Sequence, residues 1–111
     1  MKDDLVYLRH IRGCIRRIEE DVAEGRDVFM ASHTVQDAVL RNLQTMAEAT
    51  QRLSDAAKAI RPEIEWRAVA AFRNVLVHNY LGVDLERVWE IVQRDVPALK
   101  AAILAILESK P

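Results

Sequence analysis

Apolar residues recur every three or four positions along most of this chain, which is the spacing of amphipathic helices. The first series predicts a helix over residues 3–24 that ends near Gly25. A second series follows an N-cap at Ser32 or Thr34 and predicts one long helix that ends before Pro62, after a linker over 26–31. The first stripe contains Leu5, Leu8, Ile11, Ile15, Ile18 and Val22, and the second contains Val39, Leu43, Met46, Thr50, Leu53, Ala57 and Ile60.

The second half of the chain predicts shorter helices. A third helix is expected to begin near Glu65 or Trp66 and to finish near Gly82. Its inward positions are Val69, Phe72, Leu76 and Val77. A fourth is expected over residues 84–94, starting at Asp84, with Val88, Ile91 and Val92 inward.

The last helix is predicted over residues 96–108, with Asp95 as its N-cap and Pro97 in its first turn. Proline is tolerated there because the amide that it lacks would have no partner within the helix. Together these elements predict an all-α protein, a compact antiparallel bundle of four to five helices in a single domain over residues 1–111.

Composition restricts the classes of function. With 50% hydrophobic and 30% charged residues, the chain contains no apolar run long enough to cross a bilayer, so no membrane association is expected. Its first residues turn acidic and carry no apolar signal segment, so we expect a cytoplasmic protein. A formal charge of −1 is atypical of a protein that binds nucleic acid over its whole surface, and any RNA contact should use a local patch.

Cysteine and histidine usage gives no indication of a metal centre or cofactor. Cys14 is the single cysteine, which excludes an internal disulfide and a cysteine-based zinc site; it is expected to be a small buried hydrophobic residue. His10, His33 and His78 lack the spacing of metal ligands, and no glycine-rich phosphate loop occurs. We therefore expect neither a metal nor a cofactor.

The candidate chemistry lies at the end of the third helix, in Arg73-Asn74-Val75-Leu76-Val77-His78-Asn79-Tyr80. Arginine binds phosphate through paired hydrogen bonds, and histidine exchanges protons near neutral pH. Relative to Arg73, a regular helix places Asn74 at about 100°, His78 at about 140° and Tyr80 at about −20° around the axis. Asn74 could therefore orient His78. His78 and Tyr80 would diverge unless the helix distorts or a second subunit completes the site.

A structural role is the alternative for these residues. An Arg and a His at a helix terminus often cap carbonyls or bind a nearby carboxylate, and this interpretation is favoured if the motif is taken alone. Tyr80 alone would most often have a packed ring and a solvated hydroxyl.

A wider set of residues changes that balance. The run Pro62-Glu63-Ile64-Glu65-Trp66, then Val69, Phe72-Arg73-Asn74, His78, Tyr80, Val88-Trp89, Ile91-Val92 and Asp95-Val96-Pro97 resembles the HepT family of the HEPN group. The resemblance implies a metal-independent endoribonuclease toxin with Arg73 and His78 as catalytic residues, acting on RNA that includes transfer RNA. It also implies a homodimer or a higher homo-oligomer, with a cleft between two subunits that is lined by two copies of the motif.

The same resemblance implies a regulatory role for Tyr80. In the HepT family, the tyrosine two residues after the histidine receives AMP from a partner nucleotidyltransferase, the antitoxin MntA. Asn79 stands where the family often has Asp, so this chain lacks a negative charge beside His78. We expect Asn74 and Asn79 to support the site rather than to catalyse.

Several other residues have competing interpretations. Arg9, Arg12 and Arg16 lie along one side of the first helix and could steer RNA, although a solvated face is favoured because Glu19, Glu20 and Asp21 follow. Glu48 is a candidate buried partner for Arg73 or Arg41. Trp66 and Trp89 are expected in the core or an interface, with base stacking as a remote second role.

Three functional hypotheses remain open from the sequence. The first is the endoribonuclease toxin. The second is a non-catalytic helical subunit that binds nucleotide and completes a minimal nucleotidyltransferase, since HEPN domains include members that only bind nucleotides or partners. The third is a simple dimerisation bundle, suggested by the apolar seam between Val39 and Ile60.

Overall fold

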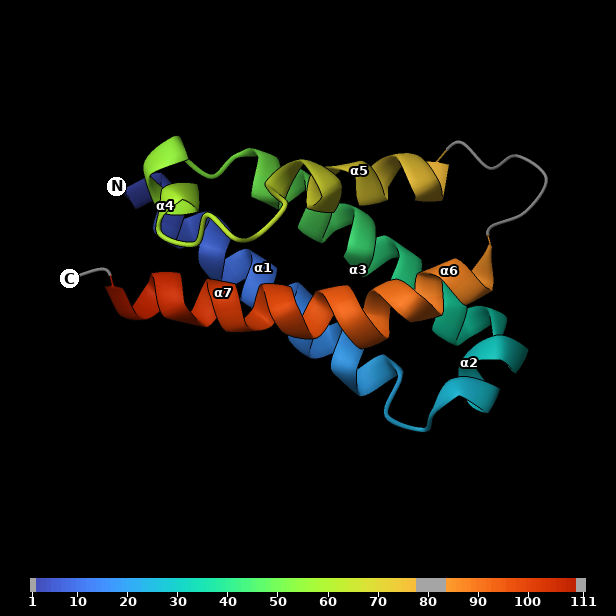
Figure 1. The fold of residues 1–111 in the computed structure, drawn as a ribbon. Helices are drawn as coiled ribbons and strands as arrows, with labels where there is room; N and C mark the ends of the chain where they lie inside the picture. Colours follow the sequence, from blue (N-terminus) through green and yellow to red (C-terminus); the bar gives the residue numbers. More distant parts are fainter. Residues whose placement is uncertain (1, 78–83, 110–111) are drawn as a thin grey trace.

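The structure is a computed structural model that describes residues 2–77 and 84–109. These ranges are helical apart from short connections and contain no strand, which confirms the predicted all-α class (Figure 1). The elements in chain order are α1 (Lys2–Asp21), α2 (Arg26–Ala31), α3 (His33–Gln51), α4 (Asp55–Ala59), α5 (Trp66–Val77), α6 (Leu85–Glu90), the π-helical turn η1 (Ile91–Asp95) and α7 (Val96–Ser109).

Helix α3 lies at the centre of the bundle. It packs against α1 on one side and α5 on another, and α1 also packs against α7 (Figure 1). The predicted stripe of α1 is confirmed, because Leu8, Ile11, Ile15 and Ile18 are fully or almost fully buried. Val39, Leu43 and Met46 of α3 are likewise buried. Amphipathic faces therefore build the core around α1 and α3.

The segment 26–31, predicted as a linker, is the short helix α2. Gly25 precedes it with φ 98°, a left-handed conformation that favours glycine. The Nε2 atom of Gln36 donates hydrogen bonds to the carbonyls of Phe29 and Met30 at 2.9 and 3.1 Å, which satisfies acceptors at the end of α2. Six residues are too few to establish helical periodicity, so the sequence pattern missed this helix.

The helix predicted to run from the Ser32 cap to Pro62 is divided into α3 and α4. The first boundary is as predicted, because the Ser32 hydroxyl accepts a hydrogen bond from the Val35 amide at 3.2 Å. The break at 52–54 arises from Asp4 of α1, whose carboxylate accepts from the Ser54 amide at 2.8 Å and from the Ser54 hydroxyl at 2.6 Å. Ser54 also caps α4 by accepting from the Ala57 amide at 3.1 Å.

The apolar series continues across this break. Thr50, Leu53 and Ala57 are buried as predicted, whereas Ile60 is 38% exposed. The chain thus maintains its inward face while it changes direction. A pattern of apolar positions alone cannot distinguish this arrangement from one continuous helix.

The predicted cap at Asp95 is wrong, because the chain stays helical from α6 through η1 into α7. Val96 has φ −64° and ψ −46°, and its amide bonds to the carbonyl of Ile91 in an i to i−5 pattern. Pro97 lacks an amide hydrogen, and its ring would clash with the carbonyl four residues earlier in a regular α-helix. The wider π-turn accommodates this proline without ending the helix.

Two other boundaries agree with the sequence. Helix α5 begins at Trp66, and α6 begins after Asp84, whose carboxylate accepts from the Arg87 amide at 3.2 Å. The predicted end of the third helix near Gly82 lies outside the described residues. Within 2–77 and 84–109, no helix is both long and apolar enough to span a membrane.

Candidate functional site

Helix α5 carries the first part of the candidate motif and is held against α3 by its apolar face. Val69 and Phe72 are both 6% exposed and belong to the core. Arg73 and Asn74 follow Phe72 directly, within the last six residues of α5, Phe72–Val77. The fold therefore places the backbone of Arg73 and Asn74 on a helix that is packed at its centre.

The remaining motif residues are not placed by the structure. His78, Asn79 and Tyr80 lie outside the described residues, and so do the side chains of Arg73 and Asn74. Their convergence on one substrate stays a prediction.

The first turn of α5, upstream of the motif, is fixed by Trp66. The indole Nε1 donates to the carbonyls of Lys58 and Arg61, both at 3.2 Å, and so connects the start of α5 to the end of α4. The indole is half-buried against the core, which confirms the expectation of a core aromatic. The direction from which α5 leads into the motif is thus set by α3 and α4.

The helix downstream of the motif is fixed by α2. Arg26 forms an ion pair with Glu86, and the rings of Phe29 and Trp89 are 5.3 Å apart at an interplanar angle of 36°. Phe29 is fully buried and Trp89 is half-buried. Residues 78–83 are therefore flanked by two helices that the rest of the bundle anchors.

Glu48 is half-buried on α3 and lines a shallow cavity of about 150 Å³ between α1 and α3. The other lining residues are Tyr7, His10, Thr45, Ala49 and Arg52. The predicted pairing of Glu48 with Arg73 stays a prediction, because the Arg73 side chain lies outside the described residues. The ion pairs among the described residues do not join Glu48 to Arg41.

Cys14 is a core residue, as the sequence indicated. It is 1% exposed, and its sulfur lies 3.9 Å from Nε2 of His10. Burial raises the pKa of the thiol above its ordinary value, and the charge of Arg17 opposes this in part. The thiol is therefore kept in its neutral form.

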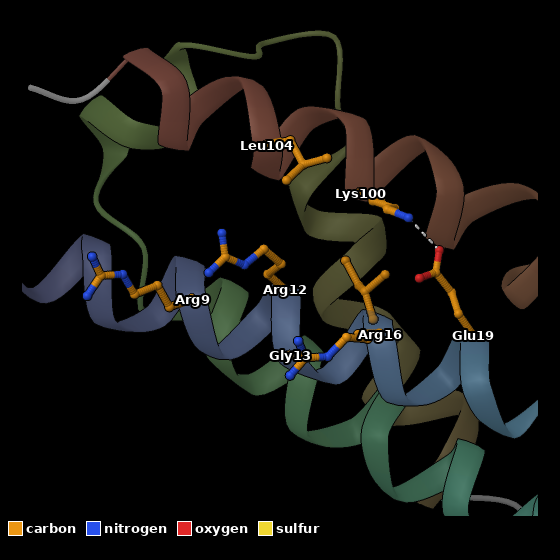
Figure 2. Close-up of a pocket in the computed structure, with 8 residues that line it drawn as sticks. Arg9, Arg12, Gly13, Arg16, Glu19, Lys100 and Leu104 are labelled. Atoms are coloured by element: carbon orange, nitrogen blue, oxygen red, sulfur yellow. Dashed lines mark hydrogen bonds and ion pairs between the residues drawn. The ribbon is translucent and has the colours of Figure 1, made fainter.

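The arginines of α1 line a groove between α1 and α7 of about 230 Å³. Figure 2 shows Arg9, Arg12 and Arg16 along α1, with Lys100 and Leu104 on α7 across the groove. Lys100 Nζ lies 2.8 Å from a carboxylate oxygen of Glu19. The arginine side chains are exposed, as a solvated face requires, but they also form the wall of a concave surface.

Sequence reasoning missed the α7 side of this groove. Lys100 and Leu104 are more than 80 residues from Arg12 and Arg16 in the chain, and no local pattern connects them. Leu104 is a large apolar residue that stays 37% exposed on the last helix, a property that only the structure shows.

No group of three or more His, Cys, Asp or Glu side chains gathers in a metal-binding arrangement within the part of the chain that the structure describes. Every buried side-chain nitrogen or oxygen in that part has a hydrogen-bond partner.

Comparison with known proteins decides the family. A sequence profile described as Ribonuclease HepT-like matches residues 11–106, from α1 to α7, and the matched range contains Arg73 through Tyr80. The chain belongs to the HepT-like ribonuclease family. The resemblance seen in the sequence is thereby confirmed, and the helical fold agrees with it.

Individual relatives agree with this assignment. The HepT-like chain is 39% identical over 108 residues to "Gamma-glutamylcyclotransferase and putative RNase" of Methanocaldococcus jannaschii, covering 96% of this chain and 49% of that protein. It is 38% identical over 95 residues to "Probable ribonuclease HepT" of Thermococcus cleftensis, covering 85% and 86%. It is also 27% identical over 111 residues to "Putative RNase" of Caldanaerobacter subterraneus, covering 99% of each.

The HepT-like chain spans about half the length of the Methanocaldococcus protein, 49%, so the two share one region only. No solved structure matches the chain significantly.

Proposed function

We propose that this HepT-like protein is a metal-independent endoribonuclease toxin of a toxin–antitoxin module, with transfer RNA as its substrate. The observation that carries the proposal is the motif Arg73-x4-His78-x-Tyr80, which lies inside the range matched by the ribonuclease family. The relatives named as ribonucleases support an RNA substrate. Helices α5 and α6, which precede and follow the motif in the chain, are each anchored to the rest of the bundle.

The chemistry follows from the residue types. A base removes the proton from a ribose 2′-hydroxyl, the 2′-oxygen forms a bond to phosphorus, and the bond to the 5′-oxygen breaks. An acid gives a proton to that leaving oxygen, and a 2′,3′-cyclic phosphate remains. His78 supplies one of the two proton transfers, Arg73 binds the phosphate oxygens, and Asn74 orients the imidazole.

The single histidine of the motif cannot readily act as base and acid on the same phosphate. A homodimer that places two copies of the motif across a cleft supplies both groups, so the proposed working unit is a dimer of two identical chains. Asn79 lies beside His78 in sequence without adding charge and contributes support only.

Tyr80 provides the proposed regulation. A cognate nucleotidyltransferase antitoxin of the MntA type attaches AMP to Tyr80: the phenol oxygen bonds to the α-phosphorus of ATP, and pyrophosphate leaves. The added phosphate and adenine would occupy the position of the substrate beside Arg73 and His78, and the modification would neutralise the toxin.

Cleavage of labelled transfer RNA by the unmodified protein is expected to continue in excess EDTA. The proposed mechanism transfers protons and stabilises charge with side chains alone, so chelation should change the rate by less than about twofold. The measurement is product formation on a denaturing gel, with magnesium-loaded protein as the comparison. Intact RNA, from a folded protein whose mass shows no added AMP, would contradict the proposal and favour the non-catalytic subunit.

Replacing Tyr80 with Phe is expected to abolish AMP attachment by the partner nucleotidyltransferase while leaving RNA cleavage within about threefold of the wild type. Phenylalanine preserves the ring and removes the one oxygen that could accept AMP. Mass spectrometry after incubation with partner and ATP measures the attachment. Tyr7→Phe, a change of the half-buried tyrosine on α1, is the control and should be modified like the wild type.

A further inference from the structure

The groove between α1 and α7 concentrates unpaired positive charge. Arg9, Arg12 and Arg16 form its α1 wall, and among the described residues none of the three has an ion pair or a hydrogen-bond partner. The one carboxylate among the lining residues, Glu19, is bound to Lys100 at 2.8 Å. The three arginines are therefore available to bind an anionic ligand.

Gly13 is another of the residues that line the groove. It lies inside α1, where glycine is less favourable than alanine because the unfolded chain gains more conformational freedom. Packing does not explain this choice, since a Cβ atom built on Gly13 would meet no heavy atom within 4 Å. A side chain at this position would lie beside Arg9 and Arg16, four and three positions away on the same helix.

The dimensions of the groove suit a chain of anions better than a single ion. Arg9 and Arg16 are separated by about 10 Å along the helix axis, and Arg12 lies between them and extends toward α7 (Figure 2). That length corresponds to roughly three nucleotides at the 3.4 Å rise of a stacked strand. Leu104, which is 37% exposed on the opposite wall, offers an apolar surface to a base or ribose.

We propose that this groove binds the phosphate backbone of the RNA strand whose cleavage occurs at the His78 motif. It would act as a second contact for RNA, on α1 and α7 rather than on α5, and would raise affinity for long substrates without taking part in catalysis. The protein has a formal charge of −1, so a local cluster of cations is the means by which it could hold a polyanion. The inference rests on the proposed ribonuclease function.

A charge test compares two triple variants in a His78→Ala background, which preserves the RNA during the measurement. The groove variant is R9Q/R12Q/R16Q, and the control is R61Q/R87Q/R94Q, whose arginines each lie within 4.0 Å of a carboxylate outside the groove. Both sets remove three positive charges. Fluorescence anisotropy of labelled transfer RNA gives the Kd of each protein between 50 and 200 mM salt.

The groove variant is expected to lose three phosphate contacts, and the control is not. At about 0.7 released counterions per contact with a single strand, the slope of log K against log salt should become shallower by about 2 in the groove variant. Over this fourfold range of salt, the affinity of the parent protein should therefore fall about 20-fold more than that of the variant. An equal loss of affinity in both triples would reflect net charge alone and would overturn the proposal.

A volume test leaves the charge unchanged. Gly13→Leu should place a bulky side chain next to Arg9 and Arg16 and weaken binding of transfer RNA at least fivefold, whereas Gly13→Ala should bind as the parent does. Circular dichroism and thermal denaturation establish that each variant is folded. Equal RNA affinity in the Leu and Ala variants would show that no strand occupies the groove.

Cleavage kinetics in the active protein separate this inference from the function on which it rests. We expect the groove triple to raise KM for transfer RNA while kcat, and cleavage of a dinucleoside monophosphate too short to reach the groove, stay unchanged. If the triple variant cleaves RNA with an unchanged KM, the proposed role of the groove is wrong, but the proposed ribonuclease function stands. A protein that neither cleaves nor binds RNA would overturn the proposed function. Normal RNA binding with lost binding to the nucleotidyltransferase would identify a protein surface instead.

Discussion

The His78→Ala protein is expected to cleave RNA at least 100-fold more slowly than the wild type, with unchanged helical content and melting temperature. A positioned general acid or base contributes roughly 10²- to 10⁴-fold to a rate, and alanine can neither accept nor donate the proton. Both copies of the motif in a dimer carry the change, so neither proton transfer would be restored by the partner chain. The measurement is single-turnover cleavage of labelled transfer RNA in EDTA.

His33→Ala is the matched control for this experiment. His33 is an exposed residue at the start of α3 and has no proposed role in catalysis, so its loss should leave the cleavage rate within about twofold. A His78→Ala protein that cleaves RNA at the wild-type rate would remove His78 from the mechanism. Loss of activity in both variants would indicate general damage to the protein.

Much of the fold was predictable because local chemistry determined it. The stripe from Leu8 to Ile18 repeats at helical spacing, and it is buried in α1. Ser32 and Asp84 carry side chains that satisfy the first free amides of a helix, and each caps the helix expected to follow it. In these elements the residues that decide the structure lie within one helical turn of one another.

The errors arose where the deciding partner is distant or the backbone geometry is unusual. The break before Ser54 depends on Asp4, which precedes it by 50 residues and is 3% exposed. Proline lacks an amide hydrogen, so Pro97 fits either the first turn of a new helix or a position after a π-turn within a continuous helix. The sequence does not distinguish these two arrangements. The pattern of apolar residues reports which face is buried, but not whether the helix axis bends.

The candidate site and the groove also differ in how far the sequence predicts them. The motif from Arg73 to Tyr80 was identifiable because its chemistry lies in eight consecutive residues, and the family match includes all of them. The groove was identifiable only in part. Arg12 and Arg16 lie on one helix, whereas Lys100 lies near them only because α7 packs against α1. Contacts between residues on different helices are the hardest feature to predict from a single sequence.

Phe29→Ala is expected to destabilise the protein by about 3–5 kcal/mol, which is a large share of the 5–15 kcal/mol typical of a domain. Phe29 is fully buried on α2, and its ring contacts Trp89 of α6, so alanine leaves a cavity between these two helices. The melting temperature should fall by at least about 10 °C. Thermal and urea denaturation measure the loss, with Val6→Ala as the control because Val6 is 63% exposed.

The same variant tests how α6 is held against α2. Glu86 and Trp89 connect α6 to α2, and α6 is the first described helix after the motif. Hydrogen exchange of the α6 amides should therefore accelerate in Phe29→Ala more than exchange in α1, whose core contacts are with α3 and α7. Uniform acceleration across all helices would show that the cavity lowers global stability alone. Unchanged denaturation would show that α2 does not anchor α6.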